Sequence, residues 1–278
     1  MAQAKVLDGV AAAKAIRQEV ALKVAKLKNR PGLATVLVGE DPGSRSYVDG
    51  KHRDCSQVGI NSIRIELPQT VSQTELLSEI NNLNSSKDCS GFIVQLPLPA
   101  HIDTNKVLSA IDPDKDADGL HPINLGKLVL SQGGIIPCTP KAIVELLGRN
   151  EISLSGKEVV IIGRGTTVGR PLSLLLSSKG IDATVTIVHS KSSDIKSHTK
   201  RADVVIAALG KAHFLTADMV KEGVVAIDVG ITRTSEGLVG DIDPEVMKVA
   251  SAFAPMPGGV GPMTRAMLLS NLLALHKD

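Results

Sequence analysis

Short runs of β-branched and apolar residues alternate with helix-like segments along most of the chain, and this alternation restricts the possible folds more than any other feature. The runs are residues 33–38, 62–67, 91–96, 158–162, 183–188, 203–207 and 224–229. Strands that are separated by helices pair in parallel, because each helix carries the chain back to the edge where the previous strand began. The sequence therefore predicts an α/β fold with parallel sheets covered by helices, rather than a sandwich or a bundle.

Residues with capping chemistry mark the starts of two helices in the N-terminal half. Ser44 is the expected N-cap of a helix that runs to about Val58, and Ser72 with Glu75 has the capping-box pattern of a helix that runs to Leu83. Apolar periodicity predicts further helices at residues 9–29 and 263–276.

The chain of 278 residues is long for one domain, since domains usually have ~100–200 residues. A loop-rich stretch at residues 112–134 predicts a boundary near Pro137. We expect an N-terminal α/β domain at residues 1–137 and a doubly wound Rossmann-type dinucleotide-binding domain at 138–262, whose first helix has Thr139 as its cap and Pro140 at its first position. Residues 255–262 are expected to form neither helix nor strand, and residues 263–278 to pack back on the first domain.

Charge and composition exclude several classes of partner. The 31 basic and 29 acidic side chains are interspersed and give a net charge of +2, and only 1% of residues are aromatic. Nucleic acid is therefore not an expected partner, because neither a positive field nor stacking platforms are present. No apolar stretch approaches the ~18 residues that span a bilayer. The three cysteines are far apart and odd in number, so we expect no disulfide framework and a cytoplasmic location.

The segment GRGTTVG at residues 163–169 lies between an expected strand and an expected helix. Backbone N–H groups at such a turn can bind a phosphate, which predicts a dinucleotide site. The spacing is GxGxxxG rather than GxGxxG, and a simple tight turn is the alternative interpretation.

The end of the second strand of this domain bears on the choice between NAD and NADP. His189, Ser190 and Lys191 stand where NAD enzymes carry a carboxylate for the ribose diol. Arg164 inside the glycine turn offers two parallel hydrogen bonds to a 2′-phosphate. NADP is therefore the expected cofactor, although Asp194 could still serve a ribose and these cations could be solvated surface charges.

Polar side chains in the N-terminal half form a candidate catalytic set. Tyr47 and Lys51 are four residues apart and share one face of the expected helix, although such a pair is usually a surface feature. Lys51 needs a lowered pKa to act as a base near neutrality. Gln95 ends an apolar strand, where ligands of open α/β sheets bind, and could orient a lysine amine or a water, or satisfy loop backbone.

The acidic run Asp114, Asp116, Asp118 and Gly119 has the opening of a calcium-binding EF-hand loop. Position twelve of that loop is Leu125 rather than glutamate, so we expect no calcium site. Asp118 is instead a candidate acceptor for hydrogen bonds from an amino-pyrimidine ring. No other metal site is expected, because His52 and Cys55 lack further ligands and His121 precedes a proline in a structural setting.

Six motifs occur in one order along the chain: YVDGK (47–51), VQLPLP (94–99), DKDADGLHP (114–122), PCTP (137–140), GRGTTVGRP (163–171) and PGGVGPMT (257–264). Together they closely resemble the bifunctional methylenetetrahydrofolate dehydrogenase/cyclohydrolase family, over essentially the whole chain. The resemblance implies NADP-dependent oxidation of 5,10-methylenetetrahydrofolate to the 5,10-methenyl form, followed by its hydrolysis to 10-formyltetrahydrofolate in the same cleft. It also implies a homodimer formed through the second domain.

The resemblance further assigns roles to individual residues. It implies that Lys51 is the main catalytic residue of hydrolysis, that Tyr47 positions the folate, that Gln95 tunes the lysine and that Asp118 anchors the pterin. The implied contacts of the substrate loop are Pro257, Gly258, Gly259, Gly261 and Pro262, and those of the cofactor are Gly163, Arg164, Gly165, Ser190 and Ile231.

One position departs from the family pattern, because many members carry serine where this chain has Gly165. The glycine removes a side-chain hydroxyl that could donate a hydrogen bond to the cofactor. Three alternatives stay open: a member with only the dehydrogenase activity, another NADP-dependent dehydrogenase on the same scaffold, and a non-catalytic NADP-binding module. The set of Tyr47, Lys51, Gln95 and Asp118 speaks against the last two.

Overall fold

The computed structural model describes residues 4–235 and 237–278, which group into two compact units. The three-stranded unit comprises Lys14–Cys138 and Arg265–Asp278, and the six-stranded unit comprises residues 4–13 and Thr139–Thr264. The sequence boundaries of 1–137 and 138–262 thus differ at the N-terminus. Residues 4–13 group with the six-stranded unit because β1 (Lys5–Val6) pairs with β11 (Ala252–Ala254) of its sheet.

The three-stranded unit contains a parallel sheet in the order β3-β2-β4. Its strands are β2 (Gly32–Val38), β3 (Asn61–Leu67) and β4 (Gly91–Val94). Every residue of β2 is buried, as expected of a central apolar strand. The expected third strand ran to Leu96 but β4 ends at Val94. The backbone N–H of Gln95 still donates to Val36 O at 2.8 Å, and Pro97 then supplies no donor to continue the ladder.

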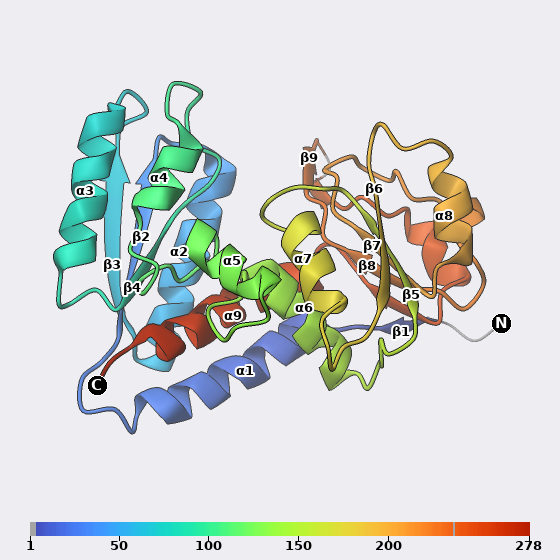
Figure 1. Ribbon diagram of the computed structural model, residues 1–278, viewed down its shortest axis with the longest axis horizontal. Coiled ribbons are helices and arrows are strands. Elements are labelled where there is room, and N and C mark those ends of the chain that lie inside the picture. Colours follow the sequence, from blue (N-terminus) through green and yellow to red (C-terminus); the bar gives the residue numbers. More distant parts are fainter. Residues whose placement is uncertain (1–3, 236) are drawn as a thin grey trace. The chain divides into compact units, whose positions relative to one another are not determined.

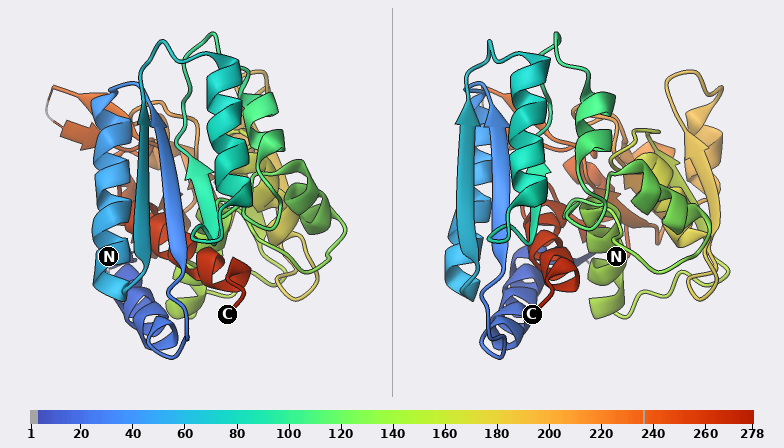
Figure 2. Two further views of the ribbon diagram at one scale, coloured as in Figure 1. Left: turned by 90° about the vertical axis from the view of Figure 1, so that its left-hand side faces the viewer. Right: turned by 60° about the vertical axis from the view of Figure 1, so that its left-hand side comes forward.

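Helices cover both faces of this sheet (Figures 1 and 2). The helices whose residues lie entirely within this unit are α2 (Pro42–Val58), α3 (Gln73–Ser85), α4 (Thr104–Ala110) and α5 (Pro122–Val129). The adjacent helices α3 and α4 lie on one face, where their apolar residues pack against Val36 and Phe92. Helix α2 packs against β2 and β3 on the other face.

Several helix boundaries in this unit differ from the sequence prediction. The cap of α2 is Asp41, whose carboxylate accepts the backbone N–H of Ser44 at 2.7 Å, so Ser44 lies in the first turn and is not the cap. The capping box of Ser72 and Glu75 is confirmed. Residues 112–134, expected as loop, contain α5, which begins at Pro122.

Two further helices begin one or more residues before the expected position. Helix α6 (Cys138–Arg149) includes Thr139 and Pro140 in its first turn, and α9 (Val260–Leu275) includes residues 260–262, which were expected to be loop. Proline is tolerated in a first turn because its missing N–H has no helical partner there. Helix α1 (Gly9–Val24) ends earlier than the predicted residue 29.

The six-stranded unit contains a parallel sheet in the order β1-β11-β8-β7-β5-β6. Its remaining strands are β5 (Glu158–Ile162), β6 (Thr184–Val188), β7 (Val204–Ala207) and β8 (Val225–Asp228). These four match the predicted runs to within a residue or so. The order reverses at β5, which pairs with β6 on one side and β7 on the other. Open α/β sheets bind ligands at such a switch point.

Short elements complete this unit. They are the helices α7 (Gly169–Leu176) and α8 (Ile195–Arg201), the 3₁₀ segments η1 (Ala217–Met219) and η2 (Pro244–Lys248), and the antiparallel pair β9 (Thr232–Thr234) and β10 (Gly237–Val239). Helices α7 and α8 both contact β5 and β6 (Figure 1).

Candidate functional site

Lys51 and Gln95 meet at one end of the three-stranded sheet. Helix α2 carries Tyr47 and Lys51 one turn apart, and Gln95 directly follows β4. Lys51 Nζ donates a hydrogen bond to Gln95 Oε1 at 2.8 Å, and Gln95 Nε2 donates to Leu96 O at 2.7 Å. The second bond fixes the orientation of the amide, so its oxygen faces the lysine. Both sequence interpretations of Gln95 are therefore found in the structure, because its oxygen contacts the lysine amine and its nitrogen satisfies loop backbone.

The environment of Lys51 destabilises its charged form. Burial lowers the pKa of the Lys51 amine, and the charge of Arg265 lowers it further, whereas Asp118 and the thiols of Cys138 and Cys55 raise it. Desolvation is the largest of these effects, so the pKa lies below the ordinary lysine value. A lysine that acts as a base near neutrality needs such a shift.

Asp118 shows the opposite shift. Burial raises the pKa of its carboxyl, Lys51 lowers it, Asp116 raises it, and a hydrogen bond with Cys138 lowers it. The net direction is upward. A lysine with a lowered pKa and a carboxyl with a raised pKa within electrostatic reach are the pattern of groups that exchange protons with a ligand.

Tyr47 completes the set on α2. Burial raises the pKa of its phenol, and the charge of Arg265 lowers it. The net increase keeps the hydroxyl protonated near neutral pH, so it is available as a hydrogen-bond donor. The four N-terminal residues predicted from the sequence therefore lie in one unit, where Lys51 interacts with Gln95 and Asp118, and Tyr47 interacts with Arg265.

Arg265 on α9 is a residue of this site that the sequence argument missed. Its Nε lies 3.0 Å from Asp54 Oδ2, and Arg17 Nη1 lies 3.8 Å from Asp54 Oδ1. A Cβ atom at Gly50 would lie 2.0 Å from Arg265 Nη1, so the guanidinium lies against the backbone of α2. The only available signal was Gly50, a poor helix former inside a helical segment, which often marks a close approach by another group.

The acidic turn before α5 is organised by Asp116. Its buried carboxylate accepts the backbone N–H groups of Gly119 at 3.0 Å and His121 at 2.8 Å, and the side-chain amide of Asn124 at 2.9 Å. Gly119 has φ +76, and a Cβ there would lie 2.7 Å from Pro137 N. Asp116 is thus engaged in holding the turn that presents Asp118.

The described residues contain no group of three or more side chains suited to a metal ion. His121 caps α5, since its Nδ1 accepts the backbone N–H of Ile123 at 3.0 Å. His52 Nδ1 forms a hydrogen bond with Ser62 Oγ. Both histidines therefore have structural partners, as the sequence argument expected of His121.

The glycine turn joins β5 to α7 at the switch point. Gly163 has φ +123, and a Cβ there would lie 2.2 Å from Ala208 O. A Cβ at Gly169 would lie 2.1 Å from Gly163 O. This close packing explains why glycine is needed at both positions. Val168 provides no side-chain cap to α7, whereas the backbone N–H of Arg170 donates to Gly165 O at 3.0 Å.

The turn contacts the end of β6. Arg164 Nη1 lies 3.2 Å from His189 Nε2, and His189 Nδ1 accepts the backbone N–H of Lys191 at 3.2 Å. Ser190 lies between His189 and Lys191 in the chain. Ile231, which follows β8, is exposed. Two donors thus face one imidazole, and a neutral imidazole accepts at only one nitrogen. An anion here would give the remaining donor an acceptor.

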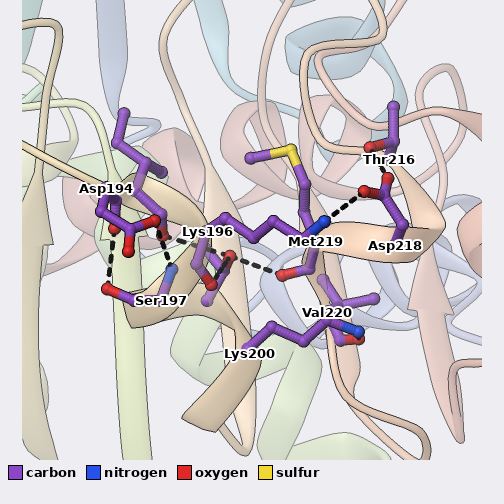
Figure 3. Close-up of polar contacts among 10 residues, drawn as sticks. Asp194, Lys196, Ser197, Lys200, Thr216, Asp218, Met219 and Val220 are labelled. Atoms are coloured by element: carbon purple, nitrogen blue, oxygen red, sulfur yellow. Dashed lines mark hydrogen bonds and ion pairs between the residues drawn. The ribbon is translucent and has the colours of Figure 1, made fainter.

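Asp194, the alternative partner for a ribose, has another role in the structure. Its carboxylate accepts the backbone N–H of Ser197 at 3.1 Å and caps α8 (Figure 3). The following helix is tied to η1 by Lys196, which donates to Asp218 at 2.6 Å. The end of β6 therefore lacks an uncommitted carboxylate among residues 189–194, and the site fits NADP better than NAD.

The predicted substrate loop lies in the six-stranded unit. Gly258 has φ +102, and the backbone N–H of Gly259 donates to Pro255 O at 2.8 Å. Pro257 belongs to this turn, whereas Gly261 and Pro262 lie in the first turn of α9.

Across residues 4–235 and 237–278, no helix has the length and apolar character needed to cross a bilayer.

Sequence profiles of one family match both halves of the chain. The profile described as the catalytic domain of tetrahydrofolate dehydrogenase/cyclohydrolase matches residues 7–118, and that described as its NAD(P)-binding domain matches residues 137–278.

Solved structures of similar proteins match at high coverage. A bifunctional methylenetetrahydrofolate dehydrogenase/cyclohydrolase (FolD) from Campylobacter jejuni is 44% identical, with a TM-score of 0.94 over 98% of each chain. A 5,10-methylenetetrahydrofolate dehydrogenase from the silkworm Bombyx mori is 42% identical, with a TM-score of 0.93 over 98% of this chain and 97% of that one. The Trypanosoma brucei dehydrogenase-cyclohydrolase, complexed with NADP and an inhibitor, is 40% identical, with a TM-score of 0.94 over 99% of this chain and 98% of that one.

Proposed function

Because this chain belongs to the tetrahydrofolate dehydrogenase/cyclohydrolase family, we propose that it oxidises 5,10-methylenetetrahydrofolate with NADP and hydrolyses the 5,10-methenyl product to 10-formyltetrahydrofolate. The observation that carries the proposal is the Lys51 amine, which has a lowered pKa and lies 2.8 Å from Gln95 Oε1. A phosphate-binding turn in the same chain supplies the site for the cofactor.

Lys51 acts in the hydrolytic step. The methenyl carbon is a cationic electrophile, so attack by water forms a C–O bond and releases a proton. The neutral Lys51 amine accepts this proton, and the lowered pKa makes the neutral amine accessible. The C–N5 bond then breaks as the proton of the new hydroxyl is transferred to N5, which leaves the formyl group on N10. Gln95 accepts one N–H of Lys51 and so directs the remaining lone pair of the amine.

Asp118 and Tyr47 hold the folate. The carboxylate of Asp118 accepts hydrogen bonds from the amino-pyrimidine edge of the pterin. The protonated Tyr47 hydroxyl provides a donor one helical turn from Lys51. We assign Pro257, Gly258, Gly259, Gly261 and Pro262 to the substrate side by resemblance to the family.

NADP, when bound, accepts the hydride from the one-carbon unit. The chain's contribution is to bind and orient the cofactor. The glycine turn, with Gly163 and Gly165, lets the backbone approach the pyrophosphate closely, and Arg164 with Ser190 binds the 2′-phosphate. The donors around His189 fit this anion, and Ile231 offers an exposed apolar surface after β8.

Assembly and location are further parts of the proposal. We assign the chain as a homodimer through the six-stranded unit, by resemblance to the family, and expect light scattering to give twice the mass of 29.1 kDa. A cytoplasmic location is supported by the three buried cysteines, Cys55, Cys89 and Cys138, which are thiols rather than disulfides. Nucleic acid remains an unexpected partner.

The decisive experiment supplies methylenetetrahydrofolate with either NADP or NAD. Reduced nucleotide, methenyl product and formyl product are followed separately. We expect nucleotide reduction that depends on folate and formation of the formyl product. If the methenyl product accumulated and was hydrolysed only at the uncatalysed rate, the protein would be a dehydrogenase without the second activity. Nucleotide binding without any folate-dependent reduction would contradict the enzyme assignment.

A further inference from the structure

Two buried carboxylates, Asp228 and Asp241, lie beside each other in the six-stranded unit. Asp228 ends β8 and is 2% exposed, and Asp241 precedes η2 and is 0% exposed. Neither residue belongs to the predicted catalytic or cofactor set. Burial of a carboxylate is unfavourable unless its oxygens are hydrogen-bonded, so the partners of these oxygens indicate what the pair does.

Asp228 holds the segment around Asp241. Its Oδ1 accepts the backbone N–H groups of Gly230 at 3.2 Å and Asp241 at 2.9 Å, and its Oδ2 accepts that of Ile242 at 3.0 Å. A Cβ at Gly240 would lie 1.9 Å from Asp228 Oδ2. The carboxylate therefore joins the end of β8 to residues 240–242 through main-chain contacts.

Asp241 in turn holds the loop after β7. Its Oδ2 accepts the backbone N–H groups of Leu209 at 2.7 Å and Gly210 at 2.9 Å, and its Oδ1 accepts that of Lys211 at 2.7 Å. A Cβ at Gly230 would lie 1.9 Å from the Asp241 carboxyl carbon. The two carboxylates and the two glycines are thus interlocked.

The loop that Asp241 holds also touches the glycine turn. The carbonyl oxygen of Ala208 lies 2.2 Å from where a Cβ of Gly163 would be. Gly230 immediately precedes Ile231, the cofactor residue after β8. The carboxylate pair therefore connects the loops at the carboxyl ends of β7 and β8, and the first of these loops packs against the turn after β5. Ligands of open α/β sheets bind along this edge.

We propose that Asp228 and Asp241 form a carboxylate latch that sets the loops after β7 and β8 in their cofactor-binding positions before the cofactor arrives. The inference rests on the proposed function, because it takes NADP as the ligand of this edge. The pKa of Asp228 is raised to about 6: burial is the main cause and Asp241 also raises it, while backbone N–H groups lower it. The fold therefore accepts an electrostatic cost at Asp228, which is consistent with a positioning role.

The test compares Asp241→Asn with Asp243→Asn in the full-length protein. An asparagine amide cannot accept on its nitrogen, so Asp241→Asn loses one or two of the three loop bonds. Asp243 lies two residues away and instead caps η2 through Glu245 N at 2.8 Å, which makes it the matched control. NADP affinity is measured by equilibrium titration, exchange of the amides of residues 209–211 by hydrogen-exchange mass spectrometry, and methenyl hydrolysis without cofactor.

For Asp241→Asn we expect NADP to bind at least about tenfold more weakly, because part of the binding free energy must now order the loop. Amide exchange at residues 209–211 should accelerate in the cofactor-free protein. Methenyl hydrolysis, which uses residues of the three-stranded unit, should stay within about twofold of wild type. Asp243→Asn should change none of the three.

A second variant covers the case in which Asp241→Asn does not fold. Gly230→Ala keeps both carboxylates but places a methyl group where the Asp241 carboxylate lies, and should show the same pattern. Unchanged NADP affinity in a folded variant with accelerated exchange would overturn the latch and leave the proposed function intact. Wild-type protein that binds no NADP would overturn both.

Discussion

The Lys51 site and the glycine turn solve two binding problems with different parts of the chain. At the Lys51 site, the proposed chemistry relies on side chains with shifted pKa values, and burial is the main cause of the shifts. At the glycine turn, the proposed site is formed by the backbone, and Gly163 and Gly169 approach main-chain oxygens that a Cβ would strike. The difference follows from the ligands. A proton transfer needs a titratable group, whereas a phosphate is bound by N–H groups whose position depends on main-chain shape.

The largest expected effect is at the first site. We predict that Lys51→Met reduces methenyl hydrolysis by about 10²- to 10⁴-fold, the usual contribution of a general acid–base group. The stem of the side chain is retained, so the fold and NADP binding should persist. The rate of hydrolysis is compared between the variant and the wild type after circular dichroism has shown equal folded content. The control is Lys23→Met, at an exposed position. Near-normal hydrolysis would show that the lysine is not the base.

Removal of the second titratable group should weaken substrate binding. Asp118→Ala should lower folate affinity by about 10- to 150-fold, since a hydrogen bond to a charged group contributes about 1.5–3 kcal/mol. NADP affinity should not change, because the cofactor turn lies in the other unit. Separate titration of the two ligands decides the matter. Equal losses for both would indicate structural damage, for which the exposed Asp114→Ala is the control.

At the cofactor site, Arg164 is the one cation of the glycine turn, and its removal tests how far the backbone suffices. Arg164→Ala should lower NADP affinity by up to about 10- to 150-fold through loss of a charge-assisted contact, and should hardly change NAD affinity. Ser190 and Lys191 can retain part of the preference. The measurement is the ratio of kcat/KM for the two nucleotides, and an unchanged ratio would falsify the role of Arg164.

A smaller effect should appear in the pH dependence of hydrolysis. Lys51 must be neutral to accept a proton, so the rate rises with pH through its pKa. Arg265 lowers this pKa and Asp118 raises it. Arg265→Gln should therefore move the rising limb to higher pH, with a roughly two- to tenfold lower rate at a fixed pH on that limb. Arg265→Lys should restore the limb.

Asp118→Asn provides the opposite test of the same electrostatics. Loss of its negative charge should move the rising limb to lower pH. A merely structural role for Arg265 would lower the rate at every pH without displacing the limb. If Arg265→Gln and Asp118→Asn displaced the rising limb in the same direction, this would contradict the assignment of Lys51 as the titrating group.

The smallest effect is expected at Gly165. No atom lies within 4 Å of a Cβ built there, so Gly165→Ser should fold with stability within about 0.5 kcal/mol of wild type. The added hydroxyl restores a donor that many family members have, and NADP affinity should rise by at most about tenfold, the effect of one neutral hydrogen bond. Reduced affinity would show that the hydroxyl disturbs the turn. Gly163→Ala, by contrast, should distort the glycine turn, because its Cβ would lie 2.2 Å from Ala208 O.

The sequence by itself determined the features that depend on neighbouring residues. Strands β5 and β7 and the capping box of Ser72 and Glu75 follow from β-branched runs and local side-chain hydrogen bonds. The glycine turn at residues 163–169 was likewise visible, because Gly163 has φ +123, a conformation that favours glycine wherever the rest of the chain lies. Family resemblance, rather than spacing, singled out Lys51 from an ordinary helix pair.

The tertiary structure alone decided which distant groups meet and how deeply they are buried. Lys51 and Gln95 are 44 residues apart, and Arg265 reaches α2 from the last helix. The pairing of β1 with β11, which moved residues 4–13 to the six-stranded unit, is also a long-range contact. The periodicity of apolar residues within a segment cannot predict such contacts. A lowered lysine pKa comes from the removal of water by residues that the sequence places far away, so it becomes readable only after the chain has packed.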